Sequence, residues 1–264
     1  MAKNTNDMKW ALVTGASSGL GVDFARELAA EGCNLVLVAR REERMRALAD
    51  ELQERHDVRV RVVALDLAQP ESGARLKDLL DGEDIIIDTL INNAGFGIFG
   101  EFVEHDLERT REMLRLNVES LTELTHRFGA DMARRGHGRI LLVASVVAYQ
   151  ASPNYAAYAA SKAYVLSLGE ALHEELKPRG VTVTVLSPGA TATAFFDVSG
   201  QDFTPLKRAF LMPSLPVVRA GLATMRRDHA SIVPGWKNKL MTFATRLAPR
   251  SVQRKIAHRV LRKR

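Results

Sequence analysis

Strand-length apolar runs, separated by longer amphipathic stretches, constrain the fold of this 264-residue chain more than any other feature. The runs are nearly continuous in valine, leucine and isoleucine, which is typical of parallel strands buried on both faces. Repeated alternation of such strands with helices indicates an α/β protein with a doubly wound parallel sheet. We therefore predict a sheet of about seven strands between layers of helices.

The expected elements follow one another without an internal repeat or a low-complexity linker. We predict one domain over residues 8–235, followed by a basic helical extension over 236–264 that either belongs to this domain or lies at its periphery. Helices are expected at 24–32, 41–56, near 70–80, over 104–134 and at about 154–177. Strands are expected at 10–15, 34–40, 60–66, 87–95, 138–145, 181–189 and, as the seventh, 230–235.

Composition indicates a globular protein, with 46% hydrophobic and 26% charged residues. Cys33 is the single cysteine, so no disulfide forms within the chain, which fits a reducing compartment. The N-terminus lacks an apolar signal region, and no apolar run is long enough to span a bilayer. We expect a cytoplasmic protein.

The net charge of +6 is unevenly distributed along the chain. Residues 229–264 hold ten lysines and arginines, and no acidic residue follows Asp228. The remainder carries 27 basic and 31 acidic residues, a net charge of −4. The high isoelectric point therefore belongs to the tail, and we do not expect nucleic-acid binding.

The stretch TGASSGLG (14–21) lies between the first predicted strand and the first helix. Gly15, Gly19 and Gly21 allow a sharp turn and a close approach of backbone to ligand. The helix that follows directs its N-terminal N–H groups toward a pyrophosphate. A tight turn without a ligand is the alternative, but the position in the first strand–helix unit favours dinucleotide binding.

The end of the second predicted strand, VLVARRE, indicates which dinucleotide is bound. An acid at this point binds the ribose diol of NAD, whereas this chain has Ala39 followed by Arg40 and Arg41. A guanidinium holds a 2′-phosphate through paired hydrogen bonds, so we predict NADP(H) over NAD(H), with Arg40 as the ligand. For Arg41, phosphate binding and the start of a solvent-facing helix both stay open. Asp66 could accept from the adenine amino group, although a helix N-cap is the better interpretation of that residue alone.

The stretch NYAAYAASKAY (154–164) places three tyrosines around one lysine. Only Tyr158 has the lysine, Lys162, four residues later and so on the same helical face. Tyr155 and Tyr164 do not share this spacing. A neighbouring ammonium group lowers the pKa of a phenol, which makes it a usable general acid or base near neutral pH. The alternative is a core tyrosine with a surface lysine.

Two further polar residues support a catalytic interpretation. Ser145 ends the apolar strand ILLVAS, and ligands of open α/β sheets bind at the carboxyl ends of strands. Asn117 interrupts a long predicted helix, where asparagine is mildly unfavourable. A buried structural amide is the alternative for Asn117.

These segments together resemble the short-chain dehydrogenase/reductase family, in its compact single-domain branch. The resemblance covers residues 10 to about 195, includes NNAG (92–95) and PGATAT (188–193), and implies a Rossmann-type fold. It implies that Tyr158 donates a proton to the substrate oxygen and that Ser145 hydrogen-bonds that oxygen. It further implies that Lys162 holds the nicotinamide ribose and that Asn117 anchors a proton-relaying water. Together with Arg40, the implied cofactor ligands are Gly15, Ser17, Ser18, Gly19, Leu20, Gly21, Asp66, Leu67, Asn93, Ala94, Gly95, Tyr158, Lys162, Pro188, Gly189 and Thr193.

Residues 194–215 correspond to the substrate lid of that family. Phe195, Phe196, Phe203 and Phe210 favour a hydrophobic carbonyl substrate, such as an acyl chain, a steroid-like ring or an aromatic ketone. Packing in the core or at a subunit contact is the alternative.

The basic tail is amphipathic. Leu240, Phe243 and Leu247 share one helical face, and Val252, Ile256 and Val260 share another after Pro249. Three interpretations stay open: contact with an anionic membrane surface at the inner membrane face, docking on an acidic neighbouring subunit, and covering of the active site.

The sequence thus predicts an NADPH-dependent carbonyl reductase, or the reverse alcohol dehydrogenase, with a small-molecule substrate and no metal. The family resemblance implies a homodimer or homotetramer. The alternatives are a non-enzymatic dinucleotide-binding regulator and a lipid-modifying reductase at a membrane surface.

Overall fold

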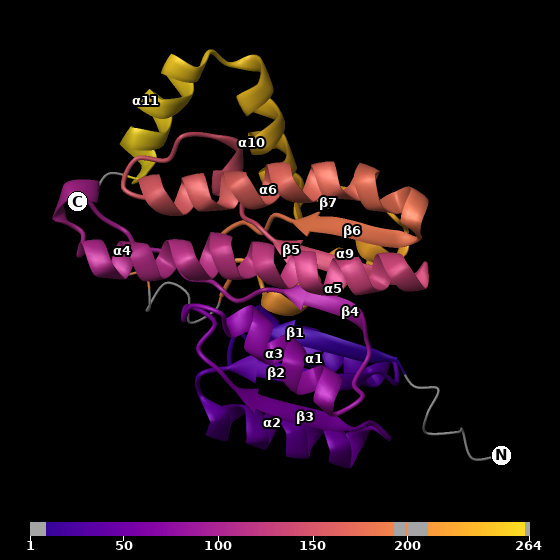
Figure 1. Ribbon diagram of the computed structural model, residues 1–264. Coiled ribbons are helices and arrows are strands. Elements are labelled where there is room, and N and C mark those ends of the chain that lie inside the picture. Colours follow the sequence, from indigo (N-terminus) through magenta and orange to yellow (C-terminus); the bar gives the residue numbers. More distant parts are fainter. Residues whose placement is uncertain (1–8, 193–198, 200–210, 262–264) are drawn as a thin grey trace.

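The computed structural model describes residues 9–192, 199 and 211–261, and Figure 1 shows one sheet between layers of helices. The prediction of a seven-stranded parallel sheet is confirmed: the strand order is β3-β2-β1-β4-β5-β6-β7 and every pair is parallel. The strands are β1 (Trp10–Thr14), β2 (Asn34–Ala39), β3 (Val60–Ala64), β4 (Ile87–Asn92), β5 (Gly138–Val143), β6 (Val181–Leu186) and β7 (Ser231–Ile232).

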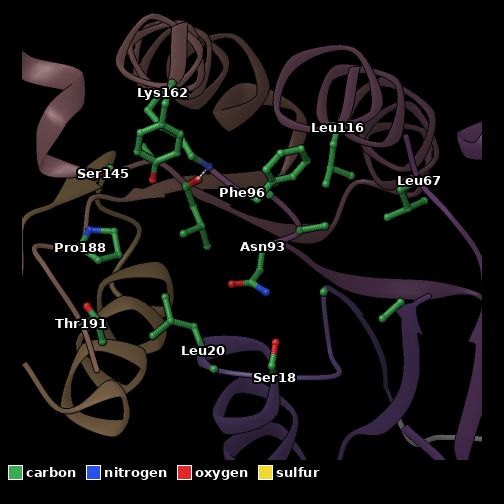
Figure 2. Close-up of a pocket in the computed structure, with 18 of the residues that line it drawn as sticks. Ser18, Leu20, Leu67, Asn93, Phe96, Leu116, Ser145, Lys162, Pro188 and Thr191 are labelled. Atoms are coloured by element: carbon green, nitrogen blue, oxygen red, sulfur yellow. Dashed lines mark hydrogen bonds between the residues drawn. The ribbon is translucent and has the colours of Figure 1, made fainter. Parts of the chain in front are cut away.

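The strand order reverses at β1, which pairs with β2 on one side and β4 on the other. Such a reversal opens a crevice at the carboxyl ends of the strands. Thr14 ties the two central strands together there: its hydroxyl accepts from the backbone N–H groups of Asn93 and Ala94, both at 2.9 Å. Figure 2 shows Asn93 at this edge, between Ser18 and Phe96.

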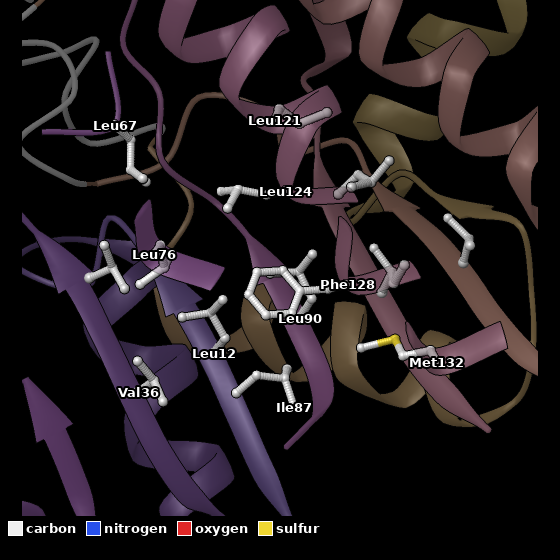
Figure 3. Packing of buried hydrophobic residues seen from close by; sticks show 14 of the residues in the cluster. Leu12, Val36, Leu67, Leu76, Ile87, Leu90, Leu121, Leu124, Phe128 and Met132 are labelled. Carbon is white, nitrogen blue, oxygen red and sulfur yellow. The ribbon is translucent and has the colours of Figure 1, made fainter. Parts of the chain in front are cut away.

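Two hydrophobic cores cover the two faces of the sheet. One face packs against α3 (Ser72–Gly82), α5 (Leu121–Arg135) and α6 (Ala156–Leu176), and Figure 3 shows Leu12, Leu90 and Phe128 within this core. The other face packs against α1 (Leu20–Ala30), α2 (Glu42–Arg55) and α9 (Ser214–Arg226). Burial of the strands from both sides explains their continuous apolar sequence. Helix α9 was not predicted from the sequence.

The long helix predicted over 104–134 is divided into several parts. A short 3-10 turn, η1 (Phe102–Glu104), precedes α4 (Leu107–Leu114), which is capped by the Asp106 carboxylate accepting from Glu108 N–H. A π-helical segment, η2 (Arg115–Ser120), then joins α4 to α5. Asn117 lies inside this segment with its side chain fully buried, and π-helical segments are frequent at functional sites.

Other boundaries differ from the sequence prediction for local reasons. Helix α6 starts two residues later than expected because Asn154 adopts a left-handed conformation, with φ of 66°. The run predicted over 181–189 ends as a strand at Leu186, ahead of Pro188, which has no N–H to donate. Short 3-10 turns, η3 (Val146–Tyr149) and η4 (Lys177–Arg179), follow β5 and α6.

The tail forms two helices, α10 (Trp236–Leu247) and α11 (Arg250–Leu261), which stand out beyond α6 in Figure 1. The first turn of α10 packs on the turn after β6: a Cβ atom at Gly189 would lie 2.3 Å from Asn238 Nδ2. Helix α10 also contacts η3. None of the described helices is both long and apolar enough to cross a bilayer.

Candidate active site

A cavity of about 520 Å³ lies at the carboxyl ends of the strands, as Figure 2 shows. It extends from the glycine-rich turn and the end of β2, past Asn93, to Ser145 and Pro188. Most of the residues predicted to bind cofactor or to act in catalysis line it. Gly21 and Asn117 are not among the lining residues, and Thr193 lies outside the described residues.

The glycine-rich turn can exist only with glycine at particular positions. Gly15 and Gly19 have positive φ of 68° and 57°. A Cβ atom at Gly15 would lie 2.8 Å from Asn93 Nδ2, and one at Gly21 would lie 2.3 Å from Gly15 O. Gly21 therefore lets α1 approach the turn, although it does not itself line the cavity. The result is an open backbone cradle at a helix N-terminus, which suits a pyrophosphate.

The two arginines after β2 have different partners. Arg40 forms a salt bridge with Glu112 at 3.1 Å and its side chain is 59% exposed. Arg41 instead reaches the glycine-rich turn, where its guanidinium donates to Ser17 Oγ at 3.0 Å and Ser18 Oγ at 2.9 Å. Arg41, for which the sequence left both interpretations open, thus lines the cavity beside the hydroxyl groups of Ser17 and Ser18.

Polar residues on the adenosine side of the cavity hold the surrounding loops. The Asp66 carboxylate accepts from Ala68 N–H at 3.0 Å and from the Gln69 amide at 3.2 Å. Asp66 thus caps the turn after β3 while lining the cavity. The Asn93 side chain donates to Thr14 O at 2.8 Å. Thr14 was not recognised from the sequence, because its role depends on a contact with residues almost 80 positions away.

Tyr158 and Ser145 meet at the far end of the cavity. Tyr158 lies in the first turn of α6, is 8% exposed, and has a side-chain hydrogen bond with Ser145. Ser145 is the N-cap of η3, and its hydroxyl accepts from Val147 N–H. Burial raises the pKa of the Tyr158 phenol, and the hydrogen bond with Ser145 opposes this effect without reversing it.

The predicted lowering of the Tyr158 pKa by Lys162 is therefore wrong. Lys162 Nζ lies 5.9 Å from the centroid of the phenol ring and donates to Val143 O at 2.7 Å, a bond drawn in Figure 2. Burial also lowers the pKa of Lys162 to about 8. Spacing along a helix indicates that two residues are neighbours, but the degree of burial decides the direction of the shift.

Asn117 stabilises the backbone that follows the NNAG segment. Its side-chain amide accepts from Phe96 N–H at 3.1 Å and donates to Phe96 O at 2.9 Å. It also donates to Ser161 Oγ at 3.1 Å. The Cβ atom missing at Gly95 would lie 2.7 Å from Asn117 Oδ1 and 3.4 Å from Lys162 Nζ. The π-helical segment thus places a buried amide directly behind the lysine.

An apolar cluster borders the catalytic end of the cavity. Its buried members are Phe96, Met113, Tyr155 and Tyr158. The ring centroid of Tyr155 lies 5.6 Å from that of Tyr158 and 5.1 Å from that of Phe99. Phe99 N–H donates to Ser199 O at 2.9 Å, and the Tyr155 hydroxyl is hydrogen-bonded to the Ser199 side chain. Tyr155 was set aside in the sequence analysis for its distance from Lys162, yet its i,i+3 spacing to Tyr158 is a signal that could have found it.

Fold and cavity together define a doubly wound α/β protein with a dinucleotide-type crevice. The sequence model of the short chain dehydrogenase family matches residues 9–202, and the chain belongs to this family. The family resemblance stated from the motifs is thereby confirmed.

Individual relatives agree with this assignment. A very-long-chain 3-oxoacyl-CoA reductase from Pyricularia oryzae is 33% identical over 240 residues, which are 89% of this chain and 71% of the relative. The 17-beta-hydroxysteroid dehydrogenase type 3 of Mus musculus is 31% identical over 216 residues, covering 81% and 70%. A short-chain dehydrogenase from Sphingobium yanoikuyae, solved in complex with NADPH, is 33% identical with a TM-score of 0.83, covering 93% and 95%.

Proposed function

We propose that this protein is an NADP(H)-dependent oxidoreductase that interconverts a hydrophobic carbonyl compound and its secondary alcohol. The observation that carries the proposal is the meeting of Tyr158 and Ser145, next to a buried Lys162, in the cavity that begins at the glycine-rich turn. A regulator that only senses a dinucleotide has no need of this arrangement.

The residues along the cavity fit a dinucleotide. The cradle at Gly15 and Gly19 suits the pyrophosphate, and Arg41 with Ser17 and Ser18 suits a 2′-phosphate. When bound, the nicotinamide supplies the hydride of the reaction. The NADPH complex of the Sphingobium relative supports the choice of NADP(H).

The chain's own groups supply the proton and stabilise charge. The Tyr158 phenol, whose pKa burial raises further above its ordinary value of about 10, is protonated at neutral pH, which is the form that donates a proton to a carbonyl oxygen during reduction. The Ser145 hydroxyl, beside the phenol, donates a hydrogen bond to the same oxygen as negative charge develops there. Lys162 is mostly protonated at pH 7, since its pKa is about 8, and it places positive charge behind the site.

The apolar cluster around Phe96 and Tyr155 supports a hydrophobic substrate. Two relatives are named for reduction of 3-oxoacyl-CoA and for dehydrogenation of hydroxysteroids. The predicted lid phenylalanines lie outside the described residues. A homodimer or homotetramer stays a prediction.

The test is NADPH oxidation against ketones graded in chain length and ring size. We expect turnover that rises with apolar size, and loss of at least ~10²-fold in kcat for Tyr158→Phe with unchanged NADPH affinity. Tyr164→Phe is the matched control, since Tyr164 is not among the residues that line the cavity and its hydroxyl is hydrogen-bonded to Thr122. Wild-type protein that binds NADPH but oxidises none of it across the panel would instead support the regulator.

A further inference from the structure

Helix α10 is docked with its polar side inward. Along its length, the residues facing the body are small or polar, and Thr242 is only 6% exposed. Asn238 contacts Met212 and the backbone of Pro234, and the threonine hydroxyls bond to backbone carbonyls of the same helix. The inward side consists of Asn238, Thr242 and Thr245.

The opposite side of α10 is apolar and points away from the protein. Four large side chains spaced three or four residues apart form it, which places them on one helical face. They are Trp236, Leu240, Phe243 and Leu247, with exposed fractions of 71%, 60%, 56% and 75%. An amphipathic helix of a globular protein normally buries its apolar face against the core. The inverted orientation of α10 therefore indicates an external apolar contact.

Helix α11 extends the exposed apolar surface of α10 and adds basic side chains to it. Val252 and Ile256 are 44% and 56% exposed on one side of it. A hollow beside the helix is lined by Pro153, Arg254, Lys255, His258 and Arg259. Pro153 is two residues from Tyr155, which lines the cavity, so this surface adjoins the catalytic end.

The cations of the two helices form no salt bridge with a carboxylate of the described residues. Among the residues that the structure describes, no salt bridge involves a lysine or arginine of α10 or α11, whereas lysines and arginines of the body form fifteen. No acidic residue exists after Asp228 to provide one from the tail. A surface with exposed aliphatic and aromatic groups, flanked by unpaired cations, complements an anionic lipid surface.

We propose that α10 and α11 bind the surface of an anionic bilayer, with the apolar side of α10 in the headgroup–acyl boundary and the cations on lipid phosphates. Tryptophan and lysine side chains are suited to this boundary, since each has an apolar body and a polar end. A second copy whose tail faces this tail fits less well, because that contact would bring two acid-free, basic helix pairs together. The binding would hold the catalytic end of the cavity beside the lipid.

The test is flotation of the full-length protein with vesicles of phosphatidylcholine alone or with about 30% phosphatidylglycerol. We expect binding to the anionic vesicles at least about tenfold tighter than to the neutral ones, and weaker binding as ionic strength rises from ~0.05 M to ~0.5 M. The double variant Leu240→Ser/Phe243→Ser should lower this partitioning about tenfold or more, because both side chains leave the lipid. In the Trp10→Phe protein, Trp236 emission should shift to the blue on addition of vesicles.

The matched control is Ile86→Ser, which removes an equally exposed side chain (57%) just ahead of β4, at the opposite end of the strands. It should leave vesicle binding unchanged. Failure of the wild type to bind anionic vesicles, or equal binding by the double variant, overturns the proposal. If the wild type does not bind vesicles and the double variant is monomeric where the wild type is an oligomer, the apolar side of α10 is instead a contact with a second copy of the chain. NADPH oxidation with a water-soluble ketone, measured without vesicles, tests the catalytic proposal independently.

Discussion

At the scale of single residues, burial of two titratable groups governs the site. Lys162 is 4% exposed and Tyr158 is 8% exposed. Each is therefore shifted toward its uncharged form, with the lysine pKa lowered to about 8 and the tyrosine pKa raised. The protein thus holds a protonated phenol and a readily deprotonated ammonium within one apolar end of a cavity.

The Lys162 shift makes stability depend on pH. The folded pKa of about 8 lies below the ordinary value of 10.5, so the unfolded chain binds more protons between these values and stability rises with pH. We expect the free energy of unfolding of the wild type to rise by about 2 kcal/mol from pH ~8 to ~9.5 relative to that of Lys162→Met, and the difference between the two proteins to become independent of pH below pH ~7, where Lys162 is charged in both the folded and the unfolded state. Urea titrations of both proteins across this range measure it. If the free energies of unfolding of the wild type and Lys162→Met changed with pH in parallel, the lowered pKa of Lys162 would be contradicted. The raised tyrosine pKa has the opposite sign but acts only near pH ~10 and above.

The choice between Arg40 and Arg41 can be measured directly. Arg41→Ala removes the guanidinium held by Ser17 and Ser18, so NADPH affinity should fall about tenfold, or about 1.4 kcal/mol, while NADH affinity stays constant. Arg40→Ala, which breaks the exposed pair with Glu112, is the matched control and should have a smaller effect. Fluorescence titration of both dinucleotides gives the constants. A larger loss of NADPH affinity in Arg40→Ala than in Arg41→Ala would support the sequence-based prediction of Arg40 as the phosphate ligand.

At the scale of elements, close approach of α1 to the turn after β1 shapes the cofactor cradle. Gly21→Ala places a methyl group against the backbone oxygen of Gly15, which cannot move without distorting the turn. We expect the free energy of unfolding to fall by about 1–3 kcal/mol. We also expect NADPH binding to be lost. Gly82→Ala, at the end of α3 with open space around it, is the control and should stabilise the protein by about 0.5–1 kcal/mol. Thermal unfolding and NADPH titration distinguish the two, and equal behaviour would refute the packing argument.

The strands could be predicted from the sequence more completely than the helices. Continuous Val, Leu and Ile runs predicted every strand, because burial on both faces leaves a strong local pattern. Helix α9 was not predicted, and only its first two residues fall within the segment predicted as a lid. The division around Asn117 was visible only as an unfavourable residue, because the partners that stabilise it, Phe96 and Ser161, are 21 and 44 positions away. Contacts across the fold, rather than local propensity, likewise decide the role of Arg41 and Thr14.

At the scale of the whole molecule, the tail is separable from the two main cores. Among the described residues, neither cluster has a member beyond Ile232. We therefore expect protein lacking residues 236–264 to unfold cooperatively, with a midpoint within about 5 °C of wild type. Its NADPH affinity should fall severalfold, because the turn at Gly189 loses its contact with Asn238. Calorimetry and NADPH titration test both statements, and an unfolded or aggregated truncation product would show that the tail is part of the core.

The Asn238–Gly189 contact has a mechanical consequence. Residue 189 has no side chain, so the first turn of α10 rests directly on the backbone that forms one wall of the reaction chamber. When α10 is held at a membrane by its exposed apolar side, a change in the orientation of the rest of the protein relative to α10 would act on the backbone at Gly189. Membrane binding and the width of the cavity would then be coupled through the first turn of α10.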